Sequence, residues 1–145
     1  PNEVEARHYT RTSDVIEAAQ VLADRVPAVV ITRGAAGVFA VIEGETISLP
    51  AVPAQVVDTT GAGDTFCAGL TWAHLQGLAP RAALSVASLA AAHTVGRPGG
   101  SGAAPTLEGL ARWTRTLELP VAYDLSFLDL IDVGTPPRAN GEEER

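Results

Sequence analysis

Two carboxylates flank a short stretch with almost no side chain in the segment VVDTTGAGDTF, residues 56–66. The small residues between Asp58 and Asp64 include Gly61, Ala62 and Gly63. Backbone N–H groups that no side chain covers can approach an anion closely, and a helix N-terminus adds a favourable dipole. A carboxylate beside a phosphate can accept the proton of an attacking hydroxyl. This pattern predicts a phosphate-binding turn with Asp64 as a general base.

A purely structural role for the same residues is the alternative. Thr60 can cap a helix that begins after it, and Asp64 can stabilise the helix dipole from the first turn. Asp58 can equally serve turn formation. The segment is not a Walker A loop, because no Gly-Lys-Ser/Thr follows, and it lacks the third glycine of the dinucleotide-binding fingerprint. The residue pattern alone leaves both roles open.

Strands and helices are expected on both sides of this turn. The β-branched run AVVIT, residues 28–32, predicts a buried strand, and residues 38–51 predict a hairpin that turns around Glu43-Gly44-Glu45. Residues 1–12 are polar and we expect them to be irregular. Apolar spacing and capping residues predict helices at 13–26, 61–77, 81–95 and 106–117. This alternation predicts an α/β fold.

Length and composition limit the classes of protein to consider. The chain has 145 residues, 46% of them hydrophobic, which suits one domain with a real core. The net charge of −7 argues against binding to nucleic acid or an anionic membrane. No apolar run is long enough to cross a bilayer. The single cysteine, Cys67, excludes an intrachain disulfide and is expected to pack as a small apolar group. A reducing, cytoplasmic location fits.

One segment resembles a known family. DTTGAGDTFCAGL, residues 58–70, resembles the C-terminal signature of the PfkB, or ribokinase-like, carbohydrate kinases. PNEVE (1–5), VVITRGAAG (29–37) and GRPGGSGAAP (96–105) resemble further motifs in the family's order. The resemblance implies that residues 1–118 are the C-terminal, ATP-binding and catalytic part of a doubly wound α/β domain. We expect residues 119–133 to form a docked extension and residues 134–145 a disordered tail.

The resemblance also implies a reaction and roles for individual residues. The γ-phosphoryl group of ATP, with Mg²⁺, would be transferred to a hydroxyl of a sugar or sugar-like acceptor. Asp64 matches the general base, and the amides of Gly61, Ala62 and Gly63 match the anion hole. The matches near the ATP phosphates or Mg²⁺ are Thr32, Gly34, Gly37, Asn2 and Glu5. The matches to a monovalent-cation (K⁺) site are Asp58, Thr60, Thr94, Arg97 and Gly99.

Several points stay open at this stage. Relatives carry the sugar pocket mainly in their N-terminal half, so we expect the chain to need that half or a homodimer partner. A non-catalytic fragment that binds a nucleotide or a partner is the alternative. A nucleoside or keto-deoxy-sugar acid acceptor is another, because such relatives share the Asp64 motif. Ala103 falls where relatives often have a hydroxyl, which leaves potassium dependence open. A side chain at Gly61 or Gly63 is expected to block the anion.

Overall fold

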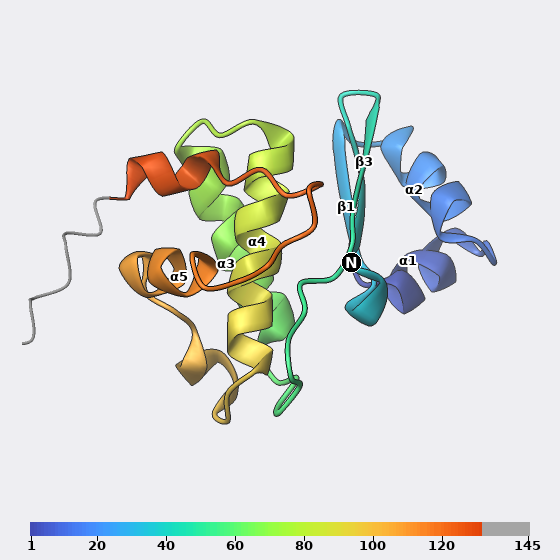
Figure 1. Cartoon of the computed structure of the whole chain (residues 1–145). Helices are drawn as coiled ribbons and strands as arrows, with labels where there is room; N and C mark the ends of the chain where they lie inside the picture. The colour runs from blue at the N-terminus through green and yellow to red at the C-terminus, as the bar shows by residue number, and fades with distance from the viewer. Residues whose placement is uncertain (132–145) are drawn as a thin grey trace, which may run out of the picture.

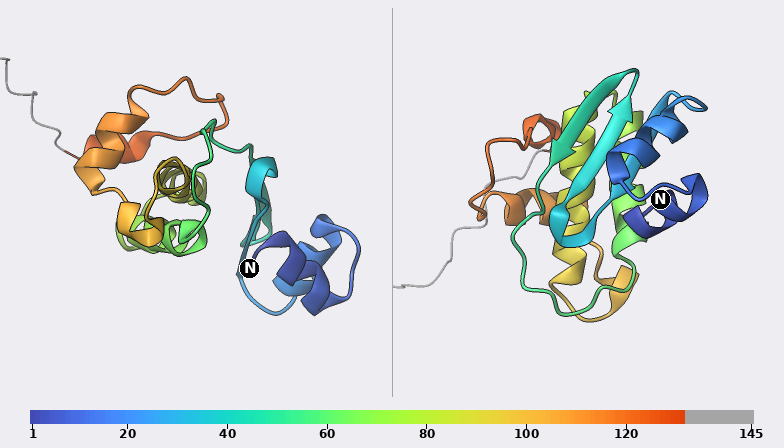
Figure 2. Two further views of the ribbon diagram at one scale, coloured as in Figure 1. Left: turned by 90° about the horizontal axis from the view of Figure 1, so that it is seen from below. Right: turned by 90° about the vertical axis from the view of Figure 1, so that its right-hand side faces the viewer.

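A sheet between two groups of helices forms the three layers of the protein (Figures 1 and 2). This computed structural model describes residues 1–131, so the tail expected at 134–145 lies outside the described residues. The elements are α1 (Glu3–Thr10), α2 (Val15–Ala23), β1 (Ala28–Thr32), β2 (Val38–Ile42), β3 (Glu45–Leu49), α3 (Ala62–Leu75), α4 (Pro80–Val95) and α5 (Leu107–Thr114). The chain also contains three short 3-10 helices within its described part: η1 (Gly34–Ala36), η2 (Gly100–Ala103) and η3 (Ser126–Leu130). The prediction of an α/β fold is confirmed.

The sheet has the order β1-β2-β3, and both of its strand pairs are antiparallel. Successive side chains of a strand point to opposite faces, so each face builds its own core. On β2, Phe39 packs toward α1 and α2, whereas Val38 and Ala40 pack toward α3 and α4. Burial on both faces explains why the strands are so rich in β-branched residues.

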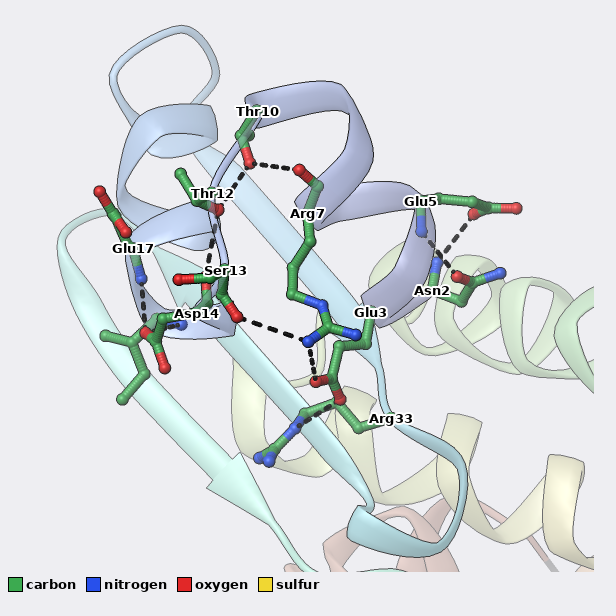
Figure 3. A network of polar contacts seen from close by, with 11 residues as sticks. Asn2, Glu3, Glu5, Arg7, Thr10, Thr12, Ser13, Asp14, Glu17 and Arg33 are labelled. Atoms are coloured by element: carbon green, nitrogen blue, oxygen red, sulfur yellow. Dashed lines mark hydrogen bonds and ion pairs between the residues drawn. The ribbon is translucent and has the colours of Figure 1, made fainter.

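The expectation that residues 1–12 are irregular is wrong, because they contain α1. Asn2 caps this helix: its Oδ1 accepts from the Glu5 N–H at 2.9 Å, and the Glu5 carboxylate accepts from the Asn2 N–H at 2.9 Å (Figure 3). These reciprocal bonds satisfy two N–H groups that a helix start would leave without partners. Ala6 is the one buried residue of α1, so the helix has almost no apolar periodicity to detect.

The remaining helices and the hairpin lie close to their predicted positions. Asp14 caps α2 through the N–H groups of residues 16 and 17, and Pro80 occupies the first turn of α4. The hairpin turns at Glu43 and Gly44, both with positive φ. Cys67 is exposed on α3, which contradicts the expectation that it packs inside. None of the helices in the described part of the chain is both long and apolar enough to cross a membrane.

The segment after α5 packs against the α4 side of the molecule (Figure 1). Phe127 in η3 is completely buried, and Tyr123 and Ile131 are each 8% exposed. They join the larger of the two cores, together with Leu110 of α5. Residues 119–131 therefore contribute apolar packing to the same core that holds α3 and α4.

Candidate functional site

A cavity of about 520 Å³ lies between the turn after β1, the loop after β3 and the helices α3 and α4. Its lining combines four segments that are distant in the sequence. Thr32, Gly34 and Gly37 come from the first turn, and Ala62 and Gly63 from the start of α3. The structure thus brings together these five candidates that the sequence predicted separately. Small residues at a strand end and bare amides at a helix start are suited to bind phosphate.

A further part of the cavity lining is mostly apolar and was not predicted. On α4 it consists of Ser88, Ala91, Ala92 and Val95, and the loop after β3 adds residues 51–54 and Val56. The α4 residues are spaced at i, i+3, i+4 and i+7, which places them on one helix face. That spacing of small residues was the available signal, since small side chains leave room beside a helix. A flat apolar group such as a nucleobase fits this chemistry.

Gly61 and Gly63 occupy different environments, although the sequence predicted one role for both. Gly61 has a φ of 75°, and a Cβ there would lie 2.4 Å from the Ser101 backbone nitrogen. Only glycine fits, because both the conformation and the contact exclude a side chain. A Cβ at Gly63 would meet nothing within 4 Å, and this residue lines the cavity. A side chain at Gly61 would therefore clash with η2. This corrects the expectation that it would block an anion.

The start of α3 presents free amides and is held against α4. Within the described residues, the N–H groups of Gly63 and Asp64 form no hydrogen bond, whereas the Ala62 N–H donates to the Thr59 carbonyl at 3.3 Å. The Thr65 hydroxyl donates to the Gly61 carbonyl at 3.0 Å, and the buried Thr94 hydroxyl donates to Thr65 at 3.3 Å. This chain of hydroxyls fixes the direction in which the free amides point.

The residues expected to bind a monovalent cation lie at the C-terminal end of α4. The Asp58 carboxylate accepts from the Thr60 N–H at 2.9 Å. The N–H and hydroxyl of Thr60 lower the pKa of Asp58 most, with smaller contributions from the N–H groups of Gly99 and Gly100. The Val95 carbonyl accepts from the Val57 N–H at 2.7 Å and the Asp58 N–H at 3.1 Å. The motif is therefore tied to both α4 and η2.

Two more cation-site candidates, Thr94 and Arg97, already have partners. The Thr94 carbonyl accepts from the Arg97 N–H at 3.1 Å, and the Arg97 guanidinium donates to the His93 carbonyl at 2.9 Å. His93 packs edge-on against Trp113 at 5.2 Å between ring centroids, and its buried Nδ1 has no hydrogen-bond partner among the residues that the structure describes. Burial is the main cause that lowers the pKa of His93, and the nearby charge of Arg97 adds to it.

Asp64, Asn2 and Glu5 lie outside the cavity lining, as do Gly61 and the five cation-site candidates. Asp64 is exposed and directly follows Gly63 in the first turn of α3. Asn2 forms a parallel bridge with Thr32, whose N–H donates to the Pro1 carbonyl at 3.1 Å. Glu5 is one turn further along α1, where its carboxylate caps the helix. In the described part of the chain, no group of three or more His, Cys, Asp or Glu side chains is arranged to hold a metal ion.

Comparisons with known proteins match this arrangement to one family. The model of the pfkB family carbohydrate kinases matches residues 1–107. The ribokinase of Haemophilus influenzae is 35% identical over 112 residues, which are 73% of this chain and 37% of that protein. The 1-phosphofructokinase of Vibrio cholerae is 36% identical over 94 residues, 64% of this chain and 30% of that protein. The chain thus spans little more than a third, or less, of the length of these relatives.

Solved structures agree with the sequence comparison. The structure of Arabidopsis thaliana ribokinase complexed with ribose and ATP superposes with a TM-score of 0.70 and 33% identity, over 77% of this chain and 38% of that one. The cavity, the glycine turn and the helix arrangement thus occur in a chain with a ribokinase-like fold. The protein belongs to the PfkB family of carbohydrate kinases.

Proposed function

We propose that this chain forms the nucleotide-binding and catalytic part of an ATP-dependent phosphotransferase that acts on a sugar hydroxyl. The observation that carries this proposal is the cavity that joins the free amides of α3 to an apolar wall. Phosphates suit the first end and an adenine ring the second. The Arabidopsis ribokinase, which binds ribose and ATP, supports the same pair of ligands.

Different residues of the chain would bind the phosphates, accept the proton and support Mg²⁺. The amides of Gly63 and Asp64, together with Thr32 and Gly34, would hold the phosphate groups. The Asp64 carboxylate is exposed beside them and would accept the proton of the attacking hydroxyl. Bound Mg²⁺ would neutralise charge on the phosphates. Since the described residues contain no cluster of metal-binding side chains, phosphate oxygens and water would supply most of its ligands, with Asn2 and Glu5 nearby.

The hydrogen-bond donors around the Asp58 carboxylate affect how much this site would need a cation. A K⁺ ion would be ligated there by Asp58 and by carbonyls of Thr60, Thr94, Arg97 and Gly99. The N–H groups of Thr60, Gly99 and Gly100 already stabilise the Asp58 carboxylate. A cation would therefore change the conformation of this turn, but it is not needed to neutralise the Asp58 carboxylate. We accordingly propose that K⁺ tunes the reaction without being essential to it.

The acceptor, the part that completes its pocket and the cellular location are proposed only in general terms. Ribokinase and cytidine kinase are both among the similar proteins, so a sugar is the first choice and a nucleoside the second. A further part of the protein, or a second copy of the chain, would complete the acceptor pocket. We place the reaction in the cytoplasm, where ATP is available and a free cysteine such as Cys67 stays reduced.

Calorimetric titration of the chain with ATP and Mg²⁺ tests the proposal. Wild type and Asp64→Asn should bind alike, because the base does not hold the nucleotide. Gly63→Val should bind at least about 10-fold more weakly, because its side chain would enter the open space in front of the amides. Equal binding by Gly63→Val and wild type would exclude the phosphate position. A folded wild-type chain that binds no nucleotide would contradict the proposal itself.

A further inference from the structure

Residues 119–131, which follow the part of the chain matched by the family model, contact the segment that forms the cavity wall. The Tyr123 hydroxyl donates to the Pro50 carbonyl at 2.7 Å, across 73 residues of sequence. The Asp124 N–H donates to the Ser85 hydroxyl at 3.0 Å, and Arg81 donates to the Ala122 carbonyl at 3.2 Å. Together these bonds fasten the segment to α4 on one side and to the end of β3 on the other.

Pro50 is the residue at which the cavity wall begins. Residues 51–56 follow it, and most of them line the cavity. None of these six residues forms a hydrogen bond with the rest of the described chain. Besides the packing of Val52 in the larger core, the wall is held at its two ends, by Tyr123 at Pro50 and by the Val95 carbonyl, which accepts from the N–H groups of Val57 and Asp58. Loss of either end attachment would loosen a loop that has no hydrogen bonds of its own.

The surroundings of Tyr123 hold its hydrogen bond to the Pro50 carbonyl in place. Only 8% of the residue is exposed, so its ring is fixed by packing and its hydroxyl has little access to water. The Tyr123 hydroxyl is protonated at neutral pH, as tyrosines ordinarily are, and burial raises its pKa further, so it stays a donor. A hydrogen bond in this setting holds the carbonyl of Pro50 in one position relative to α4, which also contributes Ser88 to the cavity lining.

We propose that Tyr123 is a positioning residue for nucleotide binding, which fixes the 51–56 wall at the distance from α4 that a nucleobase needs. The segment after α5 is then a part of the nucleotide site and not only a cover for the core. A wall that is ordered in advance lowers the entropy lost when a ligand binds. The identity of the ligand rests on the proposed function, whereas the attachment of the wall does not.

The test compares Tyr123→Phe with Tyr9→Phe, the same change at the other tyrosine of the chain. Tyr9 is 69% exposed on α1, on the opposite side of the sheet, and serves as the matched control. The first readout is the dissociation constant and stoichiometry for ATP with Mg²⁺, measured by calorimetry well below the unfolding temperature. The second is amide hydrogen exchange of Val57 and Asp58 in the chain without nucleotide, which reports on the wall itself.

The two readouts separate this inference from the proposed function. Tyr123→Phe should weaken ATP binding by about 2- to 10-fold at full stoichiometry, the range for loss of one hydrogen bond, and should speed exchange at both amides. Tyr9→Phe should change neither. If Tyr123→Phe only lowers the melting temperature and leaves affinity and exchange unchanged, the positioning role is wrong. If wild type binds no ATP, the exchange readout still decides whether Tyr123 holds the wall.

Discussion

Replacing Gly61 by alanine should destabilise the fold strongly, although it adds a single methyl group. The residue has a φ of 75°, and an L-residue with a side chain costs about 1–2 kcal/mol there. The added Cβ would also lie 2.4 Å from the nitrogen and 2.8 Å from the Cα of Ser101, which are backbone atoms that cannot rotate away. Overlap of this kind costs about 1–3 kcal/mol. The sum is a loss of about 2–5 kcal/mol.

Thermal unfolding of Gly61→Ala beside Gly63→Ala measures this effect. At about 4 °C per kcal/mol for a chain of this size, Gly61→Ala should melt about 8–20 °C below wild type. Gly63 is helical and a Cβ there meets nothing within 4 Å, so Gly63→Ala should be as stable as wild type or gain up to about 1 kcal/mol. The two glycines are only two positions apart, so both substitutions act on the same turn of the chain.

A Gly61→Ala variant with the same melting temperature as wild type would refute this reasoning. That outcome would mean that η2 does not pack against the turn, and it would remove the physical reason for the position of the α3 amides. A Gly63→Ala chain that melts as early as Gly61→Ala would show that the start of α3 is crowded. The open space from which phosphate binding is argued would then not exist.

Three other changes test separate parts of the structure. In a protein that includes the acceptor site, Asp64→Asn should lower kcat by about 10²–10⁴-fold with ATP affinity unchanged; near-normal turnover would remove Asp64 from the base role. The lowered pKa of His93 adds stability that is complete above the ordinary value of 6.5 and is lost as the pH falls through the folded-state pKa. His93→Gln should therefore flatten the melting temperature between about pH 7.5 and 5, and an equally steep profile would contradict this. Phe127→Ala should destabilise the chain by about 3–5 kcal/mol in urea unfolding, because the ring is fully buried; a loss below about 1 kcal/mol would mean that η3 does not dock.

The sequence predicted the elements with strong local signals. The strand at residues 28–32, the hairpin and the long helices were predicted because β-branched runs, turn glycines and capping residues act over a few positions. The helix α1 was missed for the opposite reason. Its only buried residue is Ala6, so apolar periodicity is weak, and the signal was the pair Asn2 and Glu5 at capping-box spacing.

The candidate site was predictable where one short motif builds it. Gly63 and Asp64 could be singled out because bare amides and a carboxylate have recognisable chemistry. The apolar wall was not singled out, although small residues recur on one face of α4, since Ala91 or Val52 is an ordinary apolar residue until the fold leaves space beside it. The different roles of Gly61 and Gly63 also required the structure, because only the position of Ser101 decides which glycine is crowded.

The two ends of the cavity should consequently respond differently to mutation. At the phosphate end, close backbone approaches set the geometry: Gly61 touches Ser101, and a Cβ at Gly100 would lie 3.1 Å from Thr60. Small changes there are transmitted to the amides, because packed backbone cannot yield. At the opposite end, the wall is a loop that has no hydrogen bonds of its own and is held at its two ends and by the packing of Val52, so a changed side chain elsewhere in it can be absorbed by a shift of the loop. Tyr123 sets how far that shift can go, which links the C-terminal segment to nucleotide affinity and leaves phosphate chemistry to the glycines.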